Sequence, residues 1–401
     1  MDELNLLAQD FACTSGSNAP DIIGILAAKR AGAARSQIGA TAVEGGQPQL
    51  SEALQAIRLP ESMAWRPEIG LAESIHRRAD ALVRAALQWA LASFIPGQIG
   101  SFRCTLPAPA PIFIDGYLIN VSGEVMVRAQ DQTLTLVDDH GESVFRQQGS
   151  VWALLSDAGR ELAWEVGHVR ADRSVYVART LTASATHGFP WPWFDGVPIA
   201  RRHQDVAGAE AHAVVAGAYD VLRAIGGETD AWVRGALSGL LLLQGKGLNT
   251  GRASSSADFP GLLALDPPMD AVHCAELIVH EASRQYANAF LLVASLLEEG
   301  REAAFYSPLK RSYETFGRVL LGAHAVGNVL LFYAQLERVQ ELNEAATDRR
   351  DILKIWFESH YMRALDSCAV LTPAGQRFWR TLRSSLMETD TFSHRRVSAG
   401  V

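Results

Sequence analysis

The 401-residue sequence lacks most features that would place it in a specialised class of protein. Four cysteines occur, Cys13, Cys104, Cys274 and Cys368, and none forms a CxxC pair, which excludes a thiolate zinc site or redox dithiol of that kind. Their wide spacing is typical of reduced, mostly buried thiols and predicts a cytoplasmic protein. The amino-terminal residues show no basic segment followed by an apolar one, so we expect no secretory signal.

Long apolar runs and an excess of positive charge are also missing. The longest apolar runs, such as Leu240–Leu243 and Phe290–Leu297, are far shorter than a membrane span, so we expect no membrane partner. Lys and Arg number 36 against 44 Asp and Glu, a net charge of −8, and no basic stripe predicts nucleic-acid binding. A hydrophobic content of 48% and a charged content of 20% are typical of a globular chain long enough for two or three domains.

Composition divides the chain into three regions, and the predicted fold class is α+β, predominantly α-helical. Residues 1–98 are Ala-rich and predict a helical amino-terminal region, with a strong helix at Leu71–Ile95 and a loop at Arg35–Gln49. Residues 99–200 contain helix-breaking prolines and short β-forming runs, which predict a small, mostly antiparallel β region. Residues 201–401 predict helices at Asp205–Ile225, Thr229–Leu243, Ala271–Glu299, Thr315–Asn343, Arg349–Cys368 and Pro373–Met387.

Two other segments have a distinctive pattern. The run HGFPWPWF, from His187 to Phe194, cannot form a long helix. A packed loop over the core is the favoured interpretation, and a lid or substrate wall is the alternative.

Gly261–Leu265 predicts a short strand just before the helix at Ala271–Glu299. Zincin-like zinc peptidases use this arrangement, and the edge of such a strand can hold an extended peptide.

The segment Ala275–Phe290 is predicted to be a buried helix with a His–Glu pair in its middle. A helix with His at i, Glu at i+1 and His at i+4 is a metal-binding signature, because positions i and i+4 project side by side. Here His280 and Glu281 are present, but Arg284 stands at the position of the second His. Taken alone, the pair favours a buried histidine hydrogen-bonded to Glu281 or to a backbone carbonyl.

A second histidine strengthens the metal interpretation. His324 lies in another strongly apolar segment, Val319–Phe332. Two histidines and a carboxylate suit zinc or non-haem ferrous iron. A core histidine next to Asn328 is an equally good interpretation of His324.

Between the two predicted helices lies Phe305–Thr315, which combines aromatic and basic residues. A guanidinium in this segment could hold the carboxylate of a cosubstrate by a two-pronged bond. A solvated interhelix loop is the alternative.

The stretch from Ser255 to Phe332 resembles the HExxH-motif proteins of bacterial peptide natural-product clusters, which are iron- and 2-oxoglutarate-dependent peptide β-hydroxylases. The matching segments are SADFPGLLAL, AELIVHEASRQY, FYSPLKR and LLGAHAVGNVLLFY, with looser matches at LPAPAPIFIDG and LTPAG. Their order and approximate spacing cover most of the chain after residue 100.

The resemblance implies that His280 is the first metal ligand, that Glu281 is the acidic member of the motif, and that His324 is an additional ligand or pocket residue. Arg284 cannot replace the second ligand, because a guanidinium is cationic and offers no lone pair. Near residue 314 the family tends to carry an Arg–Pro pair, whereas this chain has Glu314 and Thr315. The two departures together suggest an ion pair of Arg284 with Glu314 or Glu281.

Three functions follow from this resemblance. The first is an oxygenase that hydroxylates a peptide side chain, with ferrous iron held by His280, His324 and a carboxylate of Glu281 or Glu276. The 2-oxoglutarate cosubstrate would be held by basic side chains, for which the candidates are Arg284, Lys310 and Arg311.

The second function is a catalytically inactive homologue that binds a peptide or serves as a partner subunit of other maturation enzymes. The third is a zinc metallopeptidase in which Glu281 activates metal-bound water. The missing second histidine weighs more against zinc than against iron, because an iron site can recruit a carboxylate.

Overall fold

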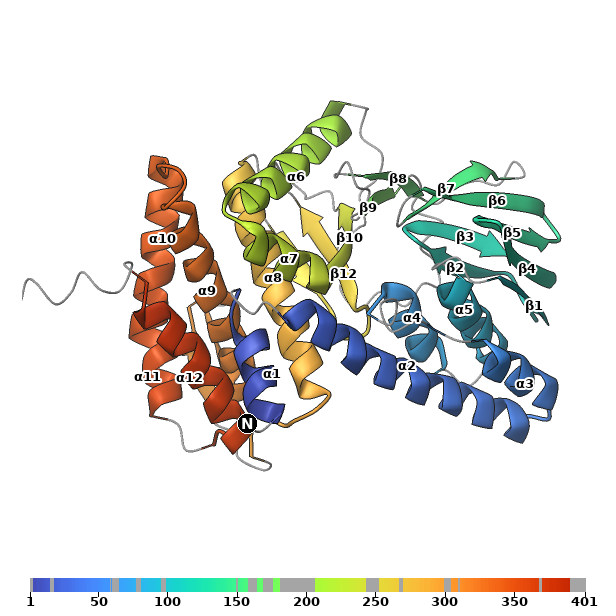
Figure 1. The fold of residues 1–401 in the computed structure, drawn as a ribbon, viewed down its shortest axis with the longest axis horizontal. Coiled ribbons are helices and arrows are strands. Elements are labelled where there is room, and N and C mark those ends of the chain that lie inside the picture. The colour runs from blue at the N-terminus through green and yellow to red at the C-terminus, as the bar shows by residue number, and fades with distance from the viewer. Residues whose placement is uncertain are drawn as a thin grey trace, which may run out of the picture. The chain divides into compact units, whose positions relative to one another are not determined.

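The computed structural model describes residues 3–14, 18–57, 59, 65–76, 81–94, 99–148, 151–157, 164–168, 176–180, 206–242, 252–266, 270–298, 304–308, 311–367 and 370–389 (Figure 1). In these residues the chain is a mixed α+β protein with many helices and small sheets, as its composition predicts. The aromatic segment His187–Phe194, with its two alternative interpretations, lies outside the described residues.

The chain forms two compact units, each assembled from separate stretches of sequence. Unit 1 consists of Met1–Ile23, Val214–Ala236 and Met269–Val401, and unit 2 consists of Gly24–Ala213 and Leu237–Pro268. The three regions predicted from composition are contiguous, whereas each compact unit draws on more than one of them.

Unit 1 is a helical unit with one small β-hairpin. Its helices are α1 (Glu3–Ala12), the end of α6 (Val206–Ala224), α7 (Gly227–Ala236), α8 (Ala271–Leu291), α9 (Phe316–Leu336), α10 (Glu344–Trp356), the π-helix η3 (Phe357–Met362), α11 (Arg363–Asp366) and α12 (Pro373–Met387), and its hairpin pairs β13 (Ala304–Ser307) with β14 (Ser312–Thr315).

Side-chain caps set where three of these helices begin. Asp270 accepts a hydrogen bond from the backbone N–H of His273 at the start of α8, and Asn343 accepts one from Ala346 at the start of α10. Thr372 caps α12, which begins with a proline at its first position. Helix α12 has the predicted bounds, and α8 begins at the predicted residue but ends eight residues earlier than predicted.

By its length and composition alone, helix α9 could cross a membrane, whereas the continuous apolar runs such as Leu240–Leu243 are too short to do so. Its most apolar 18-residue window is 83% buried within the fold. Helices α8, α10, α12 and η3 and the β13–β14 hairpin all pack against it. The pattern is that of a core helix, and a cytoplasmic location stays a prediction.

An aromatic cluster joins α7 and α1 to α8. The Tyr286 ring stacks on Trp232 at 4.3 Å between centroids and lies 5.2 Å from Phe11. The Tyr286 hydroxyl donates a hydrogen bond to the Trp232 carbonyl, so the buried polar end of this ring is satisfied. Burial of these rings fixes one side of α8, which leaves its opposite side, with His280, for the pocket described below.

Unit 2 contains helices and β-structure. Its helices are α2 (Ala19–Glu44, of which the first residues belong to unit 1), α3 (Pro48–Ala56), α4 (Pro67–His76) and α5 (Leu82–Phe94). The loop predicted at Arg35–Gln49 is wrong, because α2 continues to Glu44 with Ile38 and Ala42 fully buried on its inner side. Two separate helices, α4 and α5, replace the single helix predicted at Leu71–Ile95.

The β-structure of unit 2 forms one antiparallel sheet, one mixed sheet and one hairpin. The antiparallel sheet has the order β1-β4-β5-β6-β7, and the mixed sheet has the order β11-β12-β10-β9-β8. The strands of the first sheet are β1 Gly100–Thr105, β4 Glu124–Gln130, β5 Thr133–Asp138, β6 Gly141–Gln148 and β7 Val151–Ser156. Those of the second are β8 Trp164–His168, β9 Tyr176–Thr180, β10 Leu237–Leu242, β11 Arg252–Ser255 and β12 Gly261–Asp266. The hairpin pairs β2 Ala110–Ile114 with β3 Tyr117–Val121.

One prediction about the mixed sheet is wrong and another is confirmed. Residues Leu237–Leu242 form β10 and not the end of a helix, because this apolar run is buried in the sheet between β12 and β9, parallel to both. The strand predicted at Gly261–Leu265 is present as β12, but it pairs with β10 on one side and β11 on the other. From Leu263 to Leu265 both backbone edges of β12 are therefore paired within the sheet and are not available to a peptide.

A buried charge network closes the β2–β3 hairpin of unit 2. The turn is Asp115–Gly116, with φ of 45° and 93°, which suits an Asp–Gly hairpin turn. Arg66 pairs with Asp115 and with Glu68, whose carboxylate also accepts a hydrogen bond from the Asp115 backbone N–H at 2.8 Å. Two fully buried carboxylates thus share one guanidinium, and burial raises the pKa of Glu68 above 4.5.

A Glu68→Gln variant tests this network. The raised pKa means that the unfolded chain ionises Glu68 more readily than the folded one, so the native state loses stability as the pH rises above about 4.5. We expect the free energy of unfolding, measured in urea from about pH 4 to about pH 8, to fall with pH in the parent relative to the variant, by about 1.4 kcal/mol per unit of raised pKa. Parallel pH curves for the two proteins would contradict this assignment.

Candidate functional site

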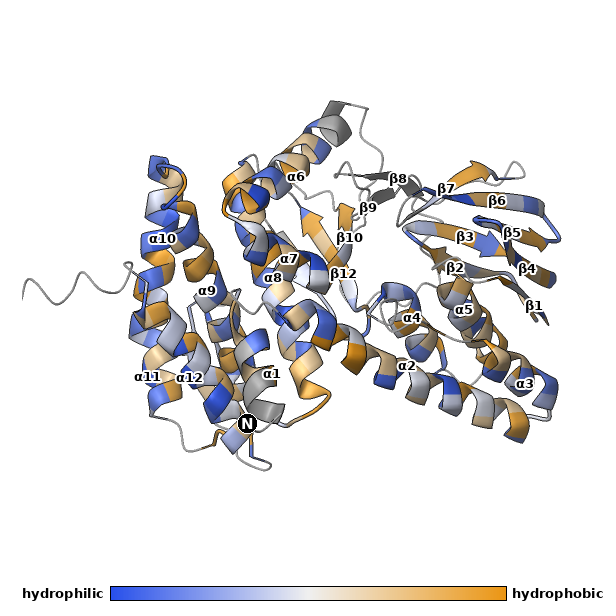
Figure 2. Cartoon of the chain, in the orientation of Figure 1, coloured by the Kyte–Doolittle hydropathy of each residue, from blue (hydrophilic) through white to orange (hydrophobic). Residues whose placement is uncertain are grey.

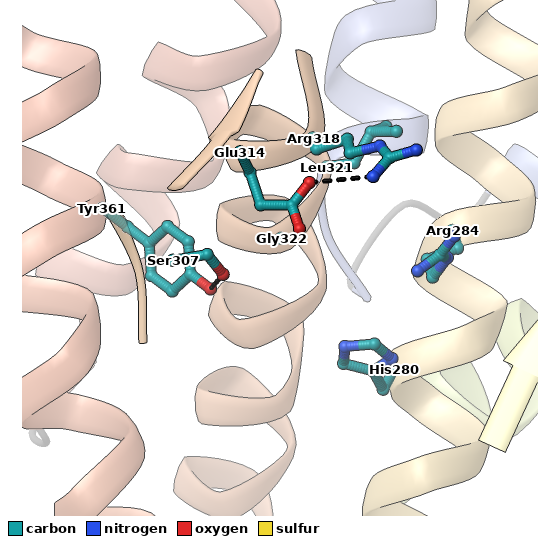
Figure 3. A pocket seen from close by; sticks show the side chains of 8 residues that line it. All are labelled: His280, Arg284, Ser307, Glu314, Arg318, Leu321, Gly322 and Tyr361. Atoms are coloured by element: carbon teal, nitrogen blue, oxygen red, sulfur yellow. Dashed lines mark hydrogen bonds and ion pairs between the residues drawn. The ribbon is translucent and has the colours of Figure 1, made fainter. Parts of the chain in front are cut away.

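A pocket of about 310 Å³ lies in unit 1, between α8, α9, η3 and the β13–β14 hairpin (Figure 3). It is lined by His280, Arg284, Ser307, Glu314, Arg318, Leu321, Gly322 and Tyr361. All these elements belong to the same compact unit. The pocket is at the lower end of the size range of small-molecule sites, and most of its lining side chains are polar.

Helix α8 supplies the first wall, with His280 and Arg284 one turn apart (Figure 3). The Nδ1 atom of His280 lies 3.1 Å from Oε1 of Glu281, which is 2% exposed. A carboxylate only accepts hydrogen bonds, so Nδ1 is the donor in this contact. Nε2 has no hydrogen-bond partner among the described residues, and the ring lines the pocket.

Arg284 is held more loosely. Its Nε atom lies 3.6 Å from Oε2 of Glu281, and its side chain is 38% exposed. Charge-assisted hydrogen bonds of this type measure about 2.7–2.9 Å, so the pair is an ion pair without a tight hydrogen bond. Glu281 is one of the two partners that the sequence suggested for Arg284.

The second wall comes from β14 and the start of α9. Glu314 accepts hydrogen bonds from Arg318 at 2.9 Å and from the Ser312 hydroxyl at 3.1 Å. Arg318 is mostly exposed, whereas only 16% of the Glu314 side chain is exposed. The other suggested partner of Arg284 is therefore paired with a different arginine.

A pair of buried hydroxyls forms a third part of the lining. The Tyr361 hydroxyl lies 3.5 Å from that of Ser307 (Figure 3). Tyr361 lies in the π-helix η3, an irregular turn that is often found at functional sites. A Cβ atom on Gly322 would come within 3.1 Å of the Tyr361 hydroxyl, so a glycine on α9 makes room for this ring.

Sequence reasoning missed Ser307, Arg318 and Tyr361 as site residues. Ser307 belongs to the aromatic and basic segment Phe305–Thr315. The tyrosines of that segment, Tyr306 and Tyr313, project from the opposite face of the hairpin and are exposed. No pattern in the sequence marks a π-helix, so nothing predicted that Tyr361 lines the pocket.

The structure separates several residues that were predicted to act together. Glu276 does not line the pocket, because its buried carboxylate accepts hydrogen bonds from Tyr333 at 2.8 Å and from Arg349 at 2.7 Å. Arg311 lies in the exposed turn of the hairpin with φ of 53°, and Lys310 lies outside the described residues.

His324 is buried and does not line the pocket. Its Nε2 atom lies 3.0 Å from the carbonyl of Phe11. The side-chain amide of Asn328 binds the carbonyl of Ala12 and the carbonyl of His324. These contacts attach α1 to α9, which is the contact pattern of a core histidine.

The donor set of the pocket does not fit an iron site of two histidines and one carboxylate. His280 offers one imidazole nitrogen, and Arg284 offers no lone pair. Within the part of the chain that the structure describes, no three His, Cys, Asp or Glu side chains converge to hold a metal ion. The chain matches no protein-family model and no curated protein at a significant level.

The burial of His324 predicts a pH dependence. Burial lowers its pKa to about 4, although hydrogen bonds to the backbone of Phe11, Ala12 and Ser283 raise it. The unfolded chain therefore binds this proton first, and stability falls as the pH drops from about 6.5 towards 4. The shift corresponds to about 3 kcal/mol in the free energy of unfolding.

Urea denaturation of the parent and of a His324→Gln variant tests this effect. We expect the variant, which cannot take up the proton, to lose less stability than the parent between pH 7 and pH 4. An equal loss in both proteins would show that His324 titrates normally in the folded state.

Proposed function

We propose that this chain is a peptide-binding homologue of the HExxH-motif proteins, which binds a carboxylate-bearing ligand in the His280–Arg284 pocket without a metal ion. The observation that carries the proposal is the state of Arg284. It lines the pocket, and its ion pair with Glu281 is too long for a tight hydrogen bond. A guanidinium with unused donors matches the two oxygen atoms of a carboxylate.

The neighbouring His280 supports the same ligand. The His280 ring lines the pocket, its Nε2 atom has no hydrogen-bond partner in the part of the chain that the structure describes, and its Nδ1 atom lies 3.1 Å from Glu281. His280 lies one helical turn from Arg284, so both side chains line the same part of the pocket. Glu281 thus orients both basic groups and does not itself line the pocket.

The peptide setting rests on the resemblance of Ser255–Phe332 to the family. So does the zincin-like assignment, in which the strand β12 is followed along the chain by a helix, α8, that would carry the metal motif. In this chain the helix keeps His280 and Glu281 but presents a permanent cation one turn later. We propose that Arg284 supplies the positive charge that a metal ion would supply, and that the protein acts as a binding or partner subunit in peptide maturation.

An iron- and 2-oxoglutarate-dependent hydroxylase is the second candidate. The observation that favours it is the carboxylate–histidine contact, because metal-ligating histidines are commonly oriented in this way. Bound iron and 2-oxoglutarate would supply the oxidising chemistry, but among the described lining residues His280 is the one that offers a metal ligand of the family's type. A zinc peptidase has less support, because Glu281 is buried and already bound to His280 and Arg284.

Ligand-detected NMR with a panel of N-acetyl amino acids, which carry a carboxylate and no ammonium group, tests the proposal. We expect binding by the parent and at least a tenfold loss in an Arg284→Gln variant, since a hydrogen bond to a charged group contributes about 1.5–3 kcal/mol. Arg338→Gln, on an exposed residue of the same unit, is the control and should bind like the parent. Absence of binding, or binding that is independent of Arg284, would refute the proposal.

The iron alternative is tested by metal content. The parent and an Arg284→His variant are purified without air and incubated with ferrous iron and 2-oxoglutarate. We expect no stoichiometric iron in the parent, because its pocket lacks the second donor, and more in the variant, which gains an imidazole at i+4 of His280. Stoichiometric iron in the parent would favour the hydroxylase instead.

A further inference from the structure

The polar groups on the second wall of the pocket suggest the class of its ligand. We infer that the ligand is a zwitterion, a free amino acid or short peptide whose carboxylate binds Arg284 and whose ammonium group binds Glu314. This inference rests on the proposed function, since it adds a second contact to the same ligand. It is carried by the position of Glu314 and by the balance of charges around the pocket.

Glu314 reaches the pocket from a different element than Arg284 does. It lies on β14, opposite Phe305 in the hairpin register, on the face of the hairpin turned away from the exposed Tyr306 and Tyr313. Figure 3 shows its carboxylate between the Tyr361–Ser307 pair and the α8 wall, joined to Arg318. A ligand in the pocket therefore meets a guanidinium on one side and a carboxylate on the other.

The charge balance argues against an anionic ligand with two carboxylates. The lining contains two guanidinium groups, Arg284 and Arg318, and one carboxylate, Glu314. Arg318 donates its 2.9 Å bond to Glu314, so Arg284 is the guanidinium that remains for a ligand carboxylate, with His280 beside it. A second carboxylate on the ligand would approach Glu314 and be repelled, whereas an ammonium group would be attracted.

A carboxylate such as that of Glu314 can be shared by several donors. A carboxylate has about four acceptor positions, so the hydrogen bonds from Arg318 and Ser312 do not exclude an ammonium group. Because only 16% of the Glu314 side chain is exposed, its attraction for a cation is screened less than that of a surface carboxylate.

The hydroxyl pair is suited to the remaining polar atoms of such a ligand. Ser307 and Tyr361 both line the pocket, and each hydroxyl is able to donate or accept a hydrogen bond. They suit a peptide carbonyl or amide N–H, or a polar amino-acid side chain. The apolar contribution to the lining is small and includes Leu321, so the recognition is mainly polar.

The test compares three forms of the proteinogenic amino acids by ligand-detected NMR and calorimetry. The free forms carry both charges, the N-acetyl forms carry only the carboxylate, and the amide forms carry only the ammonium group. We expect the parent to bind at least one free amino acid ten or more times more tightly than its N-acetyl form. We expect a Glu314→Gln variant to lose this preference while it still binds the N-acetyl form.

Two control variants separate recognition from structure. Arg318→Gln breaks the same ion pair but keeps the Glu314 carboxylate, so the preference for the free amino acid should persist. Glu341→Gln removes an exposed carboxylate elsewhere in unit 1 and should have no effect. Loss of the preference in Arg318→Gln would show that Glu314 acts only through its arginine, and it would overturn the inference.

The remaining outcomes distinguish this inference from the proposed function. If N-acetyl amino acids bind through Arg284 as tightly as the free forms, the ammonium contact is refuted and carboxylate binding stands. If no form in the panel binds, both are refuted. If only amide forms bind, the pocket recognises a cation through Glu314 and the assignment of Arg284 as the carboxylate receptor is wrong.

Discussion

Buried carboxylates need partners, and the arrangement of unit 1 follows from how two of them find theirs. Glu281 is almost fully buried on α8 and contacts two groups on its own helix, Nδ1 of His280 at 3.1 Å and the guanidinium of Arg284 at 3.6 Å. Glu276 lies on the same helix and is neutralised by Arg349 from α10, with Tyr333 from α9 as an additional donor. Leaving either charge unpaired in the protein interior would cost several kcal/mol.

The partners of Glu276 and those of Glu281 lie in different places, and the consequences differ. The partners of Glu276 come from other helices, so its network connects α8, α9 and α10 and is structural. The partners of Glu281 lie on the surface of a pocket, so the same need for neutralisation holds a guanidinium and an imidazole where a ligand reaches them. A tight ion pair would have consumed the donors of Arg284, whereas the 3.6 Å contact leaves them usable.

The pocket itself depends on the packing of a hairpin and an irregular helix around α9. Hydrophobic residues recur along the helices of unit 1 (orange in Figure 2), and most residues of α8 and α9 are buried. The β13–β14 hairpin turns Glu314 and Ser307 inward because strand residues alternate between faces. The π-helix then places Tyr361 against Gly322, and these contacts enclose the polar groups on three sides. The enclosed lining therefore combines the guanidinium of Arg284, which is held only loosely by Glu281, with the carboxylate of Glu314.

Local patterns in the sequence were sufficient for the class of fold and for much of α8. Apolar spacing predicted the helix, a capping aspartate marks its start, and the His–Glu–x–x–Arg order placed His280 and Arg284 side by side, because four residues make about one helical turn. Local patterns failed where long-range burial decided the conformation. Leu237–Leu242 forms a strand because two other strands flank it, and residues 35–44 stay helical because Ile38 and Ala42 are buried.

The tertiary structure alone decided which polar residues share the pocket. The sequence predicted His324 and Glu276, on apolar helices, as metal ligands. In the structure, His324 lies against the carbonyl of Phe11, and Glu276 pairs with Arg349, 73 residues away. Glu314 and Tyr361 joined the site through strand pairing and a π-turn. The sequence by itself determined which side chains one turn of helix brings together, since that spacing is local. Contacts between distant segments depend on how whole elements pack, and only the folded chain defines them.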